Sequence, residues 1–258
     1  KQEKEEQRDG SSPSSSTTLN RQRIVGNMLT LLFASTDSSM ATLSSLIQYL
    51  AQDETNLQEE LLEEIRTNLP NDLSTIQLAD LQPNNIPRLQ SFIYEIHRCH
   101  GAFPFLLFRA EQDIPFLNGT TTLPKGTEIF AFNRYVSINP YSPPKNIPLG
   151  PNGENNAAYC PRRFLKYSND DKNKKTVVGV ELPAHNSSSF LSFGHGGRTC
   201  VGKAFADASL ALTMVTLIRN FHIKLAPNHK TIGRIYTLAD IPDTDIRVIL
   251  TPREEKVQ

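Results

Sequence analysis

A run of ten residues near the C-terminal end, from Phe193 to Gly202, constrains this 258-residue chain more than any other feature. Its fixed positions read F-x-x-G-x-R-x-C-x-G, with the cysteine at Cys200, and a helix-compatible stretch from Lys203 to Leu217 comes next. The free N–H groups and the positive dipole end at the start of a helix stabilise negative charge. A cysteine at the first turn of this helix therefore has the setting of a thiolate held for chemistry.

Cys200 on its own has a simpler interpretation. Free cysteine is among the residues most often buried and then acts as a small hydrophobe, and a glycine-rich turn before a helix is a common connector. The fixed neighbours favour the chemical interpretation instead. Glycines let the backbone turn sharply and approach a flat ligand closely. Phe193 would keep water from the sulfur, and Arg198 offers a planar charged fork that suits a carboxylate.

The run from Phe193 to Gly202 closely resembles the haem-binding loop of cytochromes P450. The resemblance implies haem b as the cofactor, Cys200 as the axial ligand of its iron, and Arg198 as the partner of a haem propionate. It also implies that Phe193 and Gly202 are haem-binding residues. Arg109 matches a position where many relatives carry a basic residue that binds a propionate, with an ordinary strand-edge arginine as the alternative.

Four small hydroxylated residues and an acid interrupt a long predicted helix, in the run Ala34-Ser35-Thr36-Asp37-Ser38-Ser39. Such residues are poor helix formers, and hydroxyls that bond back to the preceding turn are the plain interpretation. Cytochromes P450 carry a small-Gly-x-acid-Thr-Thr run where this helix crosses the oxygen-binding face of the haem. Ala34 and Asp37 match it, while serines replace the glycine and both threonines. The resemblance thus implies that Asp37 and Ser38 relay protons as general acids.

Glu95 and Arg98 lie three residues apart on a predicted helix and therefore share a face. By itself such a pair is usually a solvated salt bridge that contributes little stability. In cytochromes P450, however, an E-x-x-R pair joins the arginine of a downstream P-x-R-F loop in a buried triad. Pro161-Arg162-Arg163-Phe164 matches that loop, so the resemblance implies a structural triad of Glu95, Arg98 and Arg163 beneath the haem.

Hydrophobic periodicity predicts a mainly α-helical chain with small β-sheets. The predicted helices cover about residues 19–50, 53–69, 87–100 and 203–217, with Asp53 as the N-cap of the second, and short antiparallel strands are expected in 105–132 and 221–250. The proline-rich segment 140–163 is expected to be irregular. Residues 1–19 mix charges with a serine-rich run and are expected to be flexible. Residues 20–258 are expected to be the C-terminal part only of a cytochrome P450 fold, because the chain starts at Lys1 and relatives are longer.

Composition and charge argue against several other classes of function. Lys plus Arg and Asp plus Glu each number 27, so the formal charge is zero and no nucleic-acid partner is expected. Three cysteines without a C-x-x-C pair argue against a disulfide framework or a structural zinc site. No apolar run reaches the ~18 residues of a membrane span. Lys203, Arg162 and Lys166 are candidates for a basic patch that docks a redox partner, with solvated surface charge as the alternative.

The resemblance implies a haem-thiolate monooxygenase that inserts one oxygen atom of O2 into a small lipophilic substrate. Its electrons are implied to come from an NADPH-dependent reductase or another electron donor. The implied location is the cytoplasmic face of the endoplasmic reticulum membrane for a full-length chain, and otherwise the cytoplasm. Two alternatives stay open: a non-catalytic truncated fragment, and a haem-thiolate isomerase or dehydratase. Asp37 and Ser38 favour oxygen activation over the isomerase.

Overall fold

The computed structural model describes residues 21–139, 147–168, 176–184, 187, 189–229, 232–237 and 239–254. The chain divides into two units, residues 1–34 and 35–258. Of the first unit, the described part is the opening of helix α1 (Arg21–Gln52), where the Thr30 hydroxyl donates to the Gly26 carbonyl at 2.9 Å. The segment 1–19, predicted to be flexible, lies outside the described residues.

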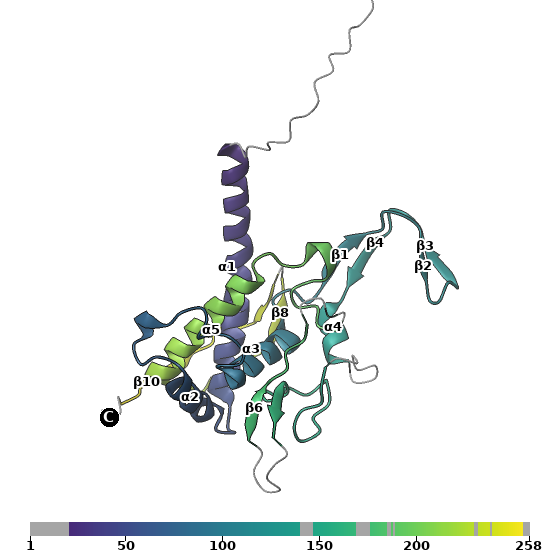
Figure 1. The fold of residues 1–258 in the computed structure, drawn as a ribbon. Helices are drawn as coiled ribbons and strands as arrows, with labels where there is room; N and C mark the ends of the chain where they lie inside the picture. The colour runs from purple at the N-terminus through teal and green to yellow at the C-terminus, as the bar shows by residue number, and fades with distance from the viewer. Residues whose placement is uncertain are drawn as a thin grey trace, which may run out of the picture. The chain divides into compact units, whose positions relative to one another are not determined.

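Helices form the centre of the second unit (Figure 1). After α1 the chain forms α2 (Leu57–Asn68), α3 (Pro87–His100), α4 (Asn133–Ile138) and α5 (Lys203–Asn220), with 3-10 turns at η1 (Leu73–Thr75) and η2 (Gly196–Arg198). Proline is well suited to the first position of α3, where an N–H would have no helical partner. The next two N–H groups, of Arg88 and Leu89, donate to the buried Glu64 carboxylate of α2 at 2.8 and 3.0 Å. Glu64 of α2 thus caps the start of α3 and links the two helices.

Asp53 lies at the entry to α2, where the sequence places a cap. Its carboxylate accepts the N–H of Leu57, the first helical residue, at 2.9 Å. The N-cap position itself is held by Asn56, so the prediction of Asp53 as the N-cap is wrong by three residues. Asn56 has a φ of 67°, which asparagine tolerates better than most residues. Asp53, four residues before Leu57, therefore accepts an N–H that has no partner within the helix. The Thr55 N–H donates to the same carboxylate, which closes a turn between Asp53 and α2.

The strands of the described residues pair as five antiparallel two-stranded sheets. The pairs are β1 (Leu106–Arg109) with β4 (Glu128–Ala131), β2 (Ile114–Phe116) with β3 (Thr121–Leu123), β5 (Leu165–Tyr167) with β6 (Val177–Val180), β7 (Phe221–Leu225) with β10 (Val248–Pro252), and β8 (Arg234–Tyr236) with β9 (Asp240–Pro242). In the first pair Leu106 lies opposite Ala131, and in the fourth Val248 lies opposite Leu225. The predicted fold class, mainly α with small β-sheets, is confirmed.

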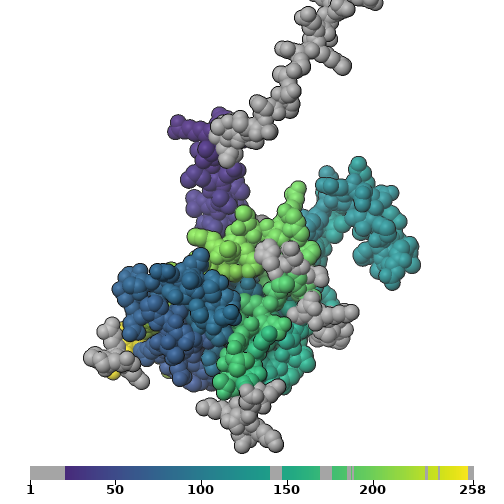
Figure 2. Space-filling model, viewed as in Figure 1, coloured from purple at the N-terminus to yellow at the C-terminus, as the bar shows by residue number. Residues whose placement is uncertain are grey.

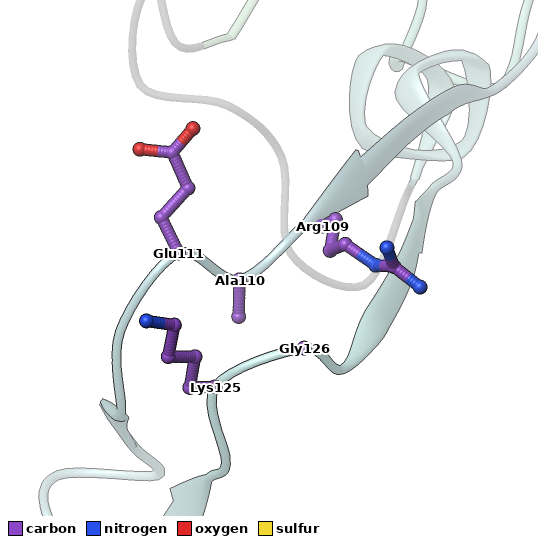
Figure 3. Close-up of a pocket in the computed structure, with 5 residues that line it drawn as sticks. All are labelled: Arg109, Ala110, Glu111, Lys125 and Gly126. Carbon is purple, nitrogen blue, oxygen red and sulfur yellow. The ribbon is translucent and has the colours of Figure 1, made fainter.

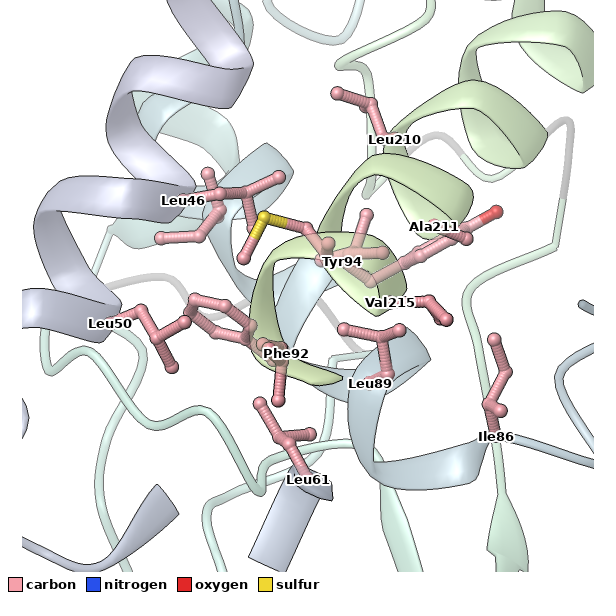
Figure 4. Close-up of a cluster of buried hydrophobic side chains, with 14 of the residues drawn as sticks. Leu46, Leu50, Leu61, Ile86, Leu89, Phe92, Tyr94, Leu210, Ala211 and Val215 are labelled. Carbon is pink, nitrogen blue, oxygen red and sulfur yellow. The ribbon is translucent and has the colours of Figure 1, made fainter. Parts of the chain in front are cut away.

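One hydrophobic core joins the later part of α1 to α2, α3 and α5. Figure 4 shows Leu46, Leu50, Leu61, Phe92 and Val215 converging from these four helices, and all five are fully buried. Burying one such side chain contributes about 1.5–3 kcal/mol relative to leaving it in water. α3 lies at the middle of this packing, because every one of its residues except Arg88 is buried.

Five short elements carry no prediction from the sequence. They are the turn η1, the helix α4, the pair β5 and β6, and the turn η2 just before the cysteine. None is long enough to show a periodic apolar pattern, so they form where the surrounding structure holds them. None of the helices within the described residues combines the length and apolar character that a membrane crossing needs.

Candidate functional site

The loop before α5 is a tight turn built on glycine. Gly194 and Gly196 have φ values of 79° and 71°, a region that residues with a side chain rarely enter. The turn closes where the Cys200 N–H donates to the Phe193 carbonyl at 2.8 Å. The Thr199 hydroxyl also donates to the Gly196 carbonyl at 2.7 Å. These bonds give the segment from Phe193 to Cys200 a defined shape.

Cys200 is exposed, which excludes the simpler interpretation of this thiol as a small buried hydrophobe. The expected place at the first turn of the helix is wrong by a few residues. α5 starts at Lys203 with Gly202 as its N-cap, so Cys200 precedes the helix. A Cβ added at Gly202 would lie 3.8 Å from the Cys200 Sγ, an ordinary van der Waals distance, so Gly202 lies directly beside the sulfur. Residues near 200, light green in the space-filling view, reach the molecular surface (Figure 2).

The residues of this loop fit a flat macrocycle that carries a thiolate-bound iron. A cysteine thiolate is a soft donor that haem iron accepts, and here the thiol is exposed. Arg198 is exposed in η2, and Phe193 is half-buried. Val201 and Phe205, beside the cysteine, are 87% and 72% exposed although both are apolar. Apolar side chains left in water around one thiol favour coverage by a large apolar ligand or by another part of a protein.

On α3, a fully buried carboxylate holds two fully buried arginines. Glu95 Oε1 and Oε2 accept hydrogen bonds from Arg98 at 2.7 Å each, and Arg163 Nε lies 3.2 Å from both oxygens. The Cys160 N–H donates to the same carboxylate at 2.7 Å. The three charged side chains are each no more than 2% exposed. They lie in direct contact, and Glu95 and Arg98 do not form a solvated surface pair.

Other N–H groups of the two arginines bind α4 and the irregular segment before β5. They donate to backbone carbonyls at 2.6–3.1 Å, those of Ser137, Pro148, Glu154, Asn155, Asn156 and Ala158. A second anchor comes from α3, where the Ser91 hydroxyl donates to the Pro161 carbonyl at 2.8 Å. The described part of this proline-rich loop therefore takes its shape from α3.

Asp37 and Ser38 lie on α1 in the second unit and are both partly exposed. The Ser38 hydroxyl donates to the Ser35 carbonyl at 3.5 Å. One turn on, the Thr42 and Ser45 hydroxyls donate to the Ser38 and Ala41 carbonyls, both at 3.0 Å. These are the back-bonds to the preceding turn by which serine and threonine are accommodated in a helix. The helix stays continuous through the polar run.

Arg109 lies at the end of β1 with a side chain that is 72% exposed. Its Nη2 is 3.7 Å from Oε1 of Glu128, its partner across the β1–β4 pair. An open pocket of about 460 Å³ is lined by Arg109, Glu111 and Lys125 together with the backbone between them. Within it the Arg109 guanidinium points away from Glu111 and Lys125 (Figure 3). Arg109 paired with Glu128 across the two strands matches the alternative interpretation, an ordinary strand-edge arginine.

His97 has a strongly shifted pKa. In the sequence it lies close to Cys99 and His100, but residues at this spacing do not share one helical face, so no metal site is expected there. Its ring packs edge-on against Phe193 at 4.7 Å between centroids, and the Ser192 hydroxyl donates to its carbonyl at 2.6 Å. The His97 Nε2 is buried without a hydrogen-bond partner among the described residues. Burial lowers the pKa of His97 from 6.5 to about 4.

This shift predicts a pH dependence of stability. Since the unfolded chain binds a proton at His97 near pH 6.5 and the folded chain only near pH 4, stability falls as the pH drops between these values. Between pH 7 and pH 4, we expect the unfolding free energy of His97→Phe to fall by about 2–3 kcal/mol less than that of the unchanged protein. Urea denaturation across this pH range measures the difference. A His97→Phe profile parallel to that of the unchanged protein would contradict this.

A second buried carboxylate lies where the β8–β9 hairpin meets the helices. Asp240 is fully buried and accepts hydrogen bonds from Arg134 at 3.0 Å and from Arg234 at 2.8 Å. Its N–H donates to the Ala102 carbonyl at 2.8 Å. His100 Nδ1 faces the carboxylate at 3.8 Å, and its Nε2 lies 2.5 Å from the Tyr49 hydroxyl. This cluster joins α1, α3, α4 and the hairpin.

Comparison with known proteins places these features in a family. A family model described as cytochrome P450 matches residues 2–235, and the chain belongs to the cytochrome P450 family. The chain resembles the probable mitochondrial cytochrome P450 12c1 of Drosophila melanogaster, with 28% identity over 80% of this chain and 36% of the relative. It also resembles sterol 14-alpha demethylase of Aspergillus flavus, with 27% identity over 84% of this chain and 40% of the relative.

The fold is similar to that in the crystal structure of a cytochrome P450, CYP102L1. The TM-score is 0.71 at 19% sequence identity, over 94% of this chain and 48% of the other. This chain therefore corresponds to part of a cytochrome P450 fold, and it spans well under half the length of the curated relatives above. Three Drosophila melanogaster relatives are named mitochondrial, and the expected endoplasmic reticulum location is not supported.

Proposed function

We propose that this chain, residues 20–258, is the haem-binding C-terminal part of a monooxygenase, with Cys200 as the axial ligand of haem b. The observation that carries the proposal is an exposed thiol, on a glycine-turned loop, in a member of the cytochrome P450 family. When bound, the haem activates O2, so that one oxygen atom enters a lipophilic substrate and the other leaves as water after two electrons and two protons arrive.

The residues of this chain then have distinct roles. Cys200 holds the cofactor, and Phe193 limits the access of water to the sulfur. Arg198 binds a carboxylate of the cofactor through its charged fork, and Arg109 has the same role once it is released from Glu128. The buried contacts of Glu95, Arg98 and Arg163 hold the irregular loop in place so that the cysteine loop can assemble above it.

Asp37 and Ser38 are proposed to hold and pass the protons that the reaction of O2 would consume. Their side chains are partly exposed on a continuous helix, so water can reach both. A carboxylate and a hydroxyl one residue apart can exchange protons through such a water. The electrons are proposed to come from an NADPH-dependent reductase or another donor, and the substrate to be small and lipophilic.

The absorption spectrum of the reduced, carbon monoxide-bound protein tests the proposal. We expect the protein expressed from its complete coding sequence to show a thiolate-type Soret band. Cys200→Ser should lose this band, while Cys160→Ser, at a buried cysteine, should keep it. A band that survives in Cys200→Ser would show that the ligand is misassigned. No uptake of haem by the unchanged protein would instead favour the non-catalytic alternative.

A further inference from the structure

A lysine charge is held away from water between α3 and the start of α5. The Lys203 ammonium donates to the Tyr94 hydroxyl and to Asp207 Oδ2, both at 2.6 Å. Tyr94 in turn donates to the same carboxylate oxygen at 3.4 Å. The Lys203 side chain is only 15% exposed, so the interpretation of this residue as solvated surface charge is wrong. Burial alone would lower the pKa of Lys203, but the bonds to Asp207 and Tyr94 outweigh it and raise that pKa, so the ammonium stays charged.

The same ammonium lies against the aromatic residue of the cysteine loop. Lys203 Nζ is 5.1 Å from the centroid of the Phe193 ring and 5.2 Å from that of the Tyr94 ring. Both distances lie within the range of cation–π attraction, which strengthens when the cation is removed from water. The His97 ring of α3 also packs against Phe193, edge-on. The Phe193 ring is therefore contacted by both α3 and α5.

The location of Lys203 on its helix is unfavourable by itself. Lys203 is the first residue of α5, where the positive end of the helix dipole repels a cation. Asp207, one turn on, offsets this repulsion, but its other oxygen, Oδ1, is buried without a partner among the described residues. An exposed salt bridge would avoid the cost of removing these charged atoms from water. We therefore expect the contact between Lys203 and Phe193 to have a role beyond pairing Lys203 with Asp207.

We propose that Lys203 is a positioning residue for Cys200. Its ammonium, anchored by Asp207 and Tyr94, holds the Phe193 ring against α3. The Phe193 carbonyl accepts the Cys200 N–H at 2.8 Å, so the position of the ring is passed to the cysteine through the backbone. The inference rests on the proposed function only in that Cys200 is taken as the ligand that has to be positioned.

Hydrogen exchange of the loop in haem-free full-length protein tests the proposal, because it reports the Cys200 N–H bond directly. In Lys203→Met we expect the peptide containing Phe193 to Cys200 to exchange about fivefold faster, the factor that a cation–π contact of ordinary strength gives. Lys203→Arg keeps the cation and should restore protection. Peptides of α2 should exchange as in the unchanged protein, which shows that each variant is folded.

The double variant Lys203→Met with Asp207→Asn separates two possible causes of faster exchange: an unpaired carboxylate at Asp207 and the lost contact with Phe193. Lys203→Met alone leaves a buried carboxylate unpaired, which destabilises any protein. The double variant removes that penalty, so fast exchange that persists in it belongs to the lost contact with Phe193. Exchange that returns to the original rate in the double variant, or that never changes in Lys203→Met, would overturn the proposal.

Failure of this inference and failure of the proposed function give different results. If Cys200 is not the ligand, the exchange results stand while the thiolate-type Soret band is absent. If Lys203 does not position the loop, the band is present and exchange does not respond to the variants. In the haem-loaded protein, Lys203→Met should also release haem to an excess of apomyoglobin about fivefold faster, with rescue by Lys203→Arg.

Discussion

Glu95→Gln is expected to lower the free energy of unfolding by about 4 kcal/mol, because it removes the carboxylate that both buried cations contact. The Arg98 and Arg163 side chains are each 0% exposed and both contact the Glu95 carboxylate. A glutamine keeps the shape but presents two N–H donors to guanidinium groups that are themselves donors. Urea denaturation followed by far-ultraviolet circular dichroism measures the change. Haem uptake should fall with it, since the loop carbonyls lose their organised partners.

The control for this prediction is an ion pair in the open. Lys166 and Glu181 lie 3.1 Å apart with side chains that are 54% and 72% exposed. Glu181→Gln should change the unfolding free energy by less than about 0.5 kcal/mol, as exposed pairs do. If Glu95→Gln cost no more than this control, the buried triad would not hold the loop in place.

The second large effect is expected at Asp240. Asp240→Asn should lower the free energy of unfolding by about 3–4 kcal/mol, because Arg134 and Arg234 lose the carboxylate that both contact. The loss is expected to be smaller than at Glu95, since the side chains of these arginines are 21% and 12% exposed and water can solvate them in part. The same urea denaturation measures it.

The pH dependence of this second site has a definite sign. Burial alone would raise the pKa of Asp240, but His100, Arg234 and Arg134 facing the carboxylate lower it below 3.8. Its contribution to stability is therefore complete above about pH 4 and is lost as the pH falls further. Asp240→Asn should remove that acid-dependent part. Asp245→Asn, at an exposed aspartate between β9 and β10, should retain it, and equal acid profiles for the two variants would contradict this assignment.

The helices could be predicted from the sequence where their apolar spacing is long enough to read. α3 has the predicted bounds, Pro87–His100, because proline marks its start and its stripe of apolar residues is unbroken. α5 runs three residues beyond the predicted end at Leu217, to Asn220, since its last turn is held by the β7 strand that follows. The six residues of α4 show no readable period, and their place depends on α3.

Some residues of the candidate site could likewise be predicted from the sequence, and others could not. The cysteine loop and the members of the Glu95 cluster are visible as compact motifs, each within a few residues of sequence. The cluster around Asp240 is not, because Arg134 and Asp240 lie 106 positions apart and only the fold brings them together. Tyr94 and Lys203 are separated by 109 positions. No spacing rule links residues so distant, so such contacts become visible only in three dimensions.

The burial of α3 on almost every side has a consequence for how this protein can vary. A helix that faces water along one edge accepts changes there at every third or fourth position, and mutational tolerance then follows the helical repeat. α3 has no such edge, since Arg88 alone is not buried. Replacements along it should be accepted chiefly when a neighbouring side chain changes volume or charge in the opposite sense. α3 is therefore expected to change through coupled pairs of substitutions rather than through single ones.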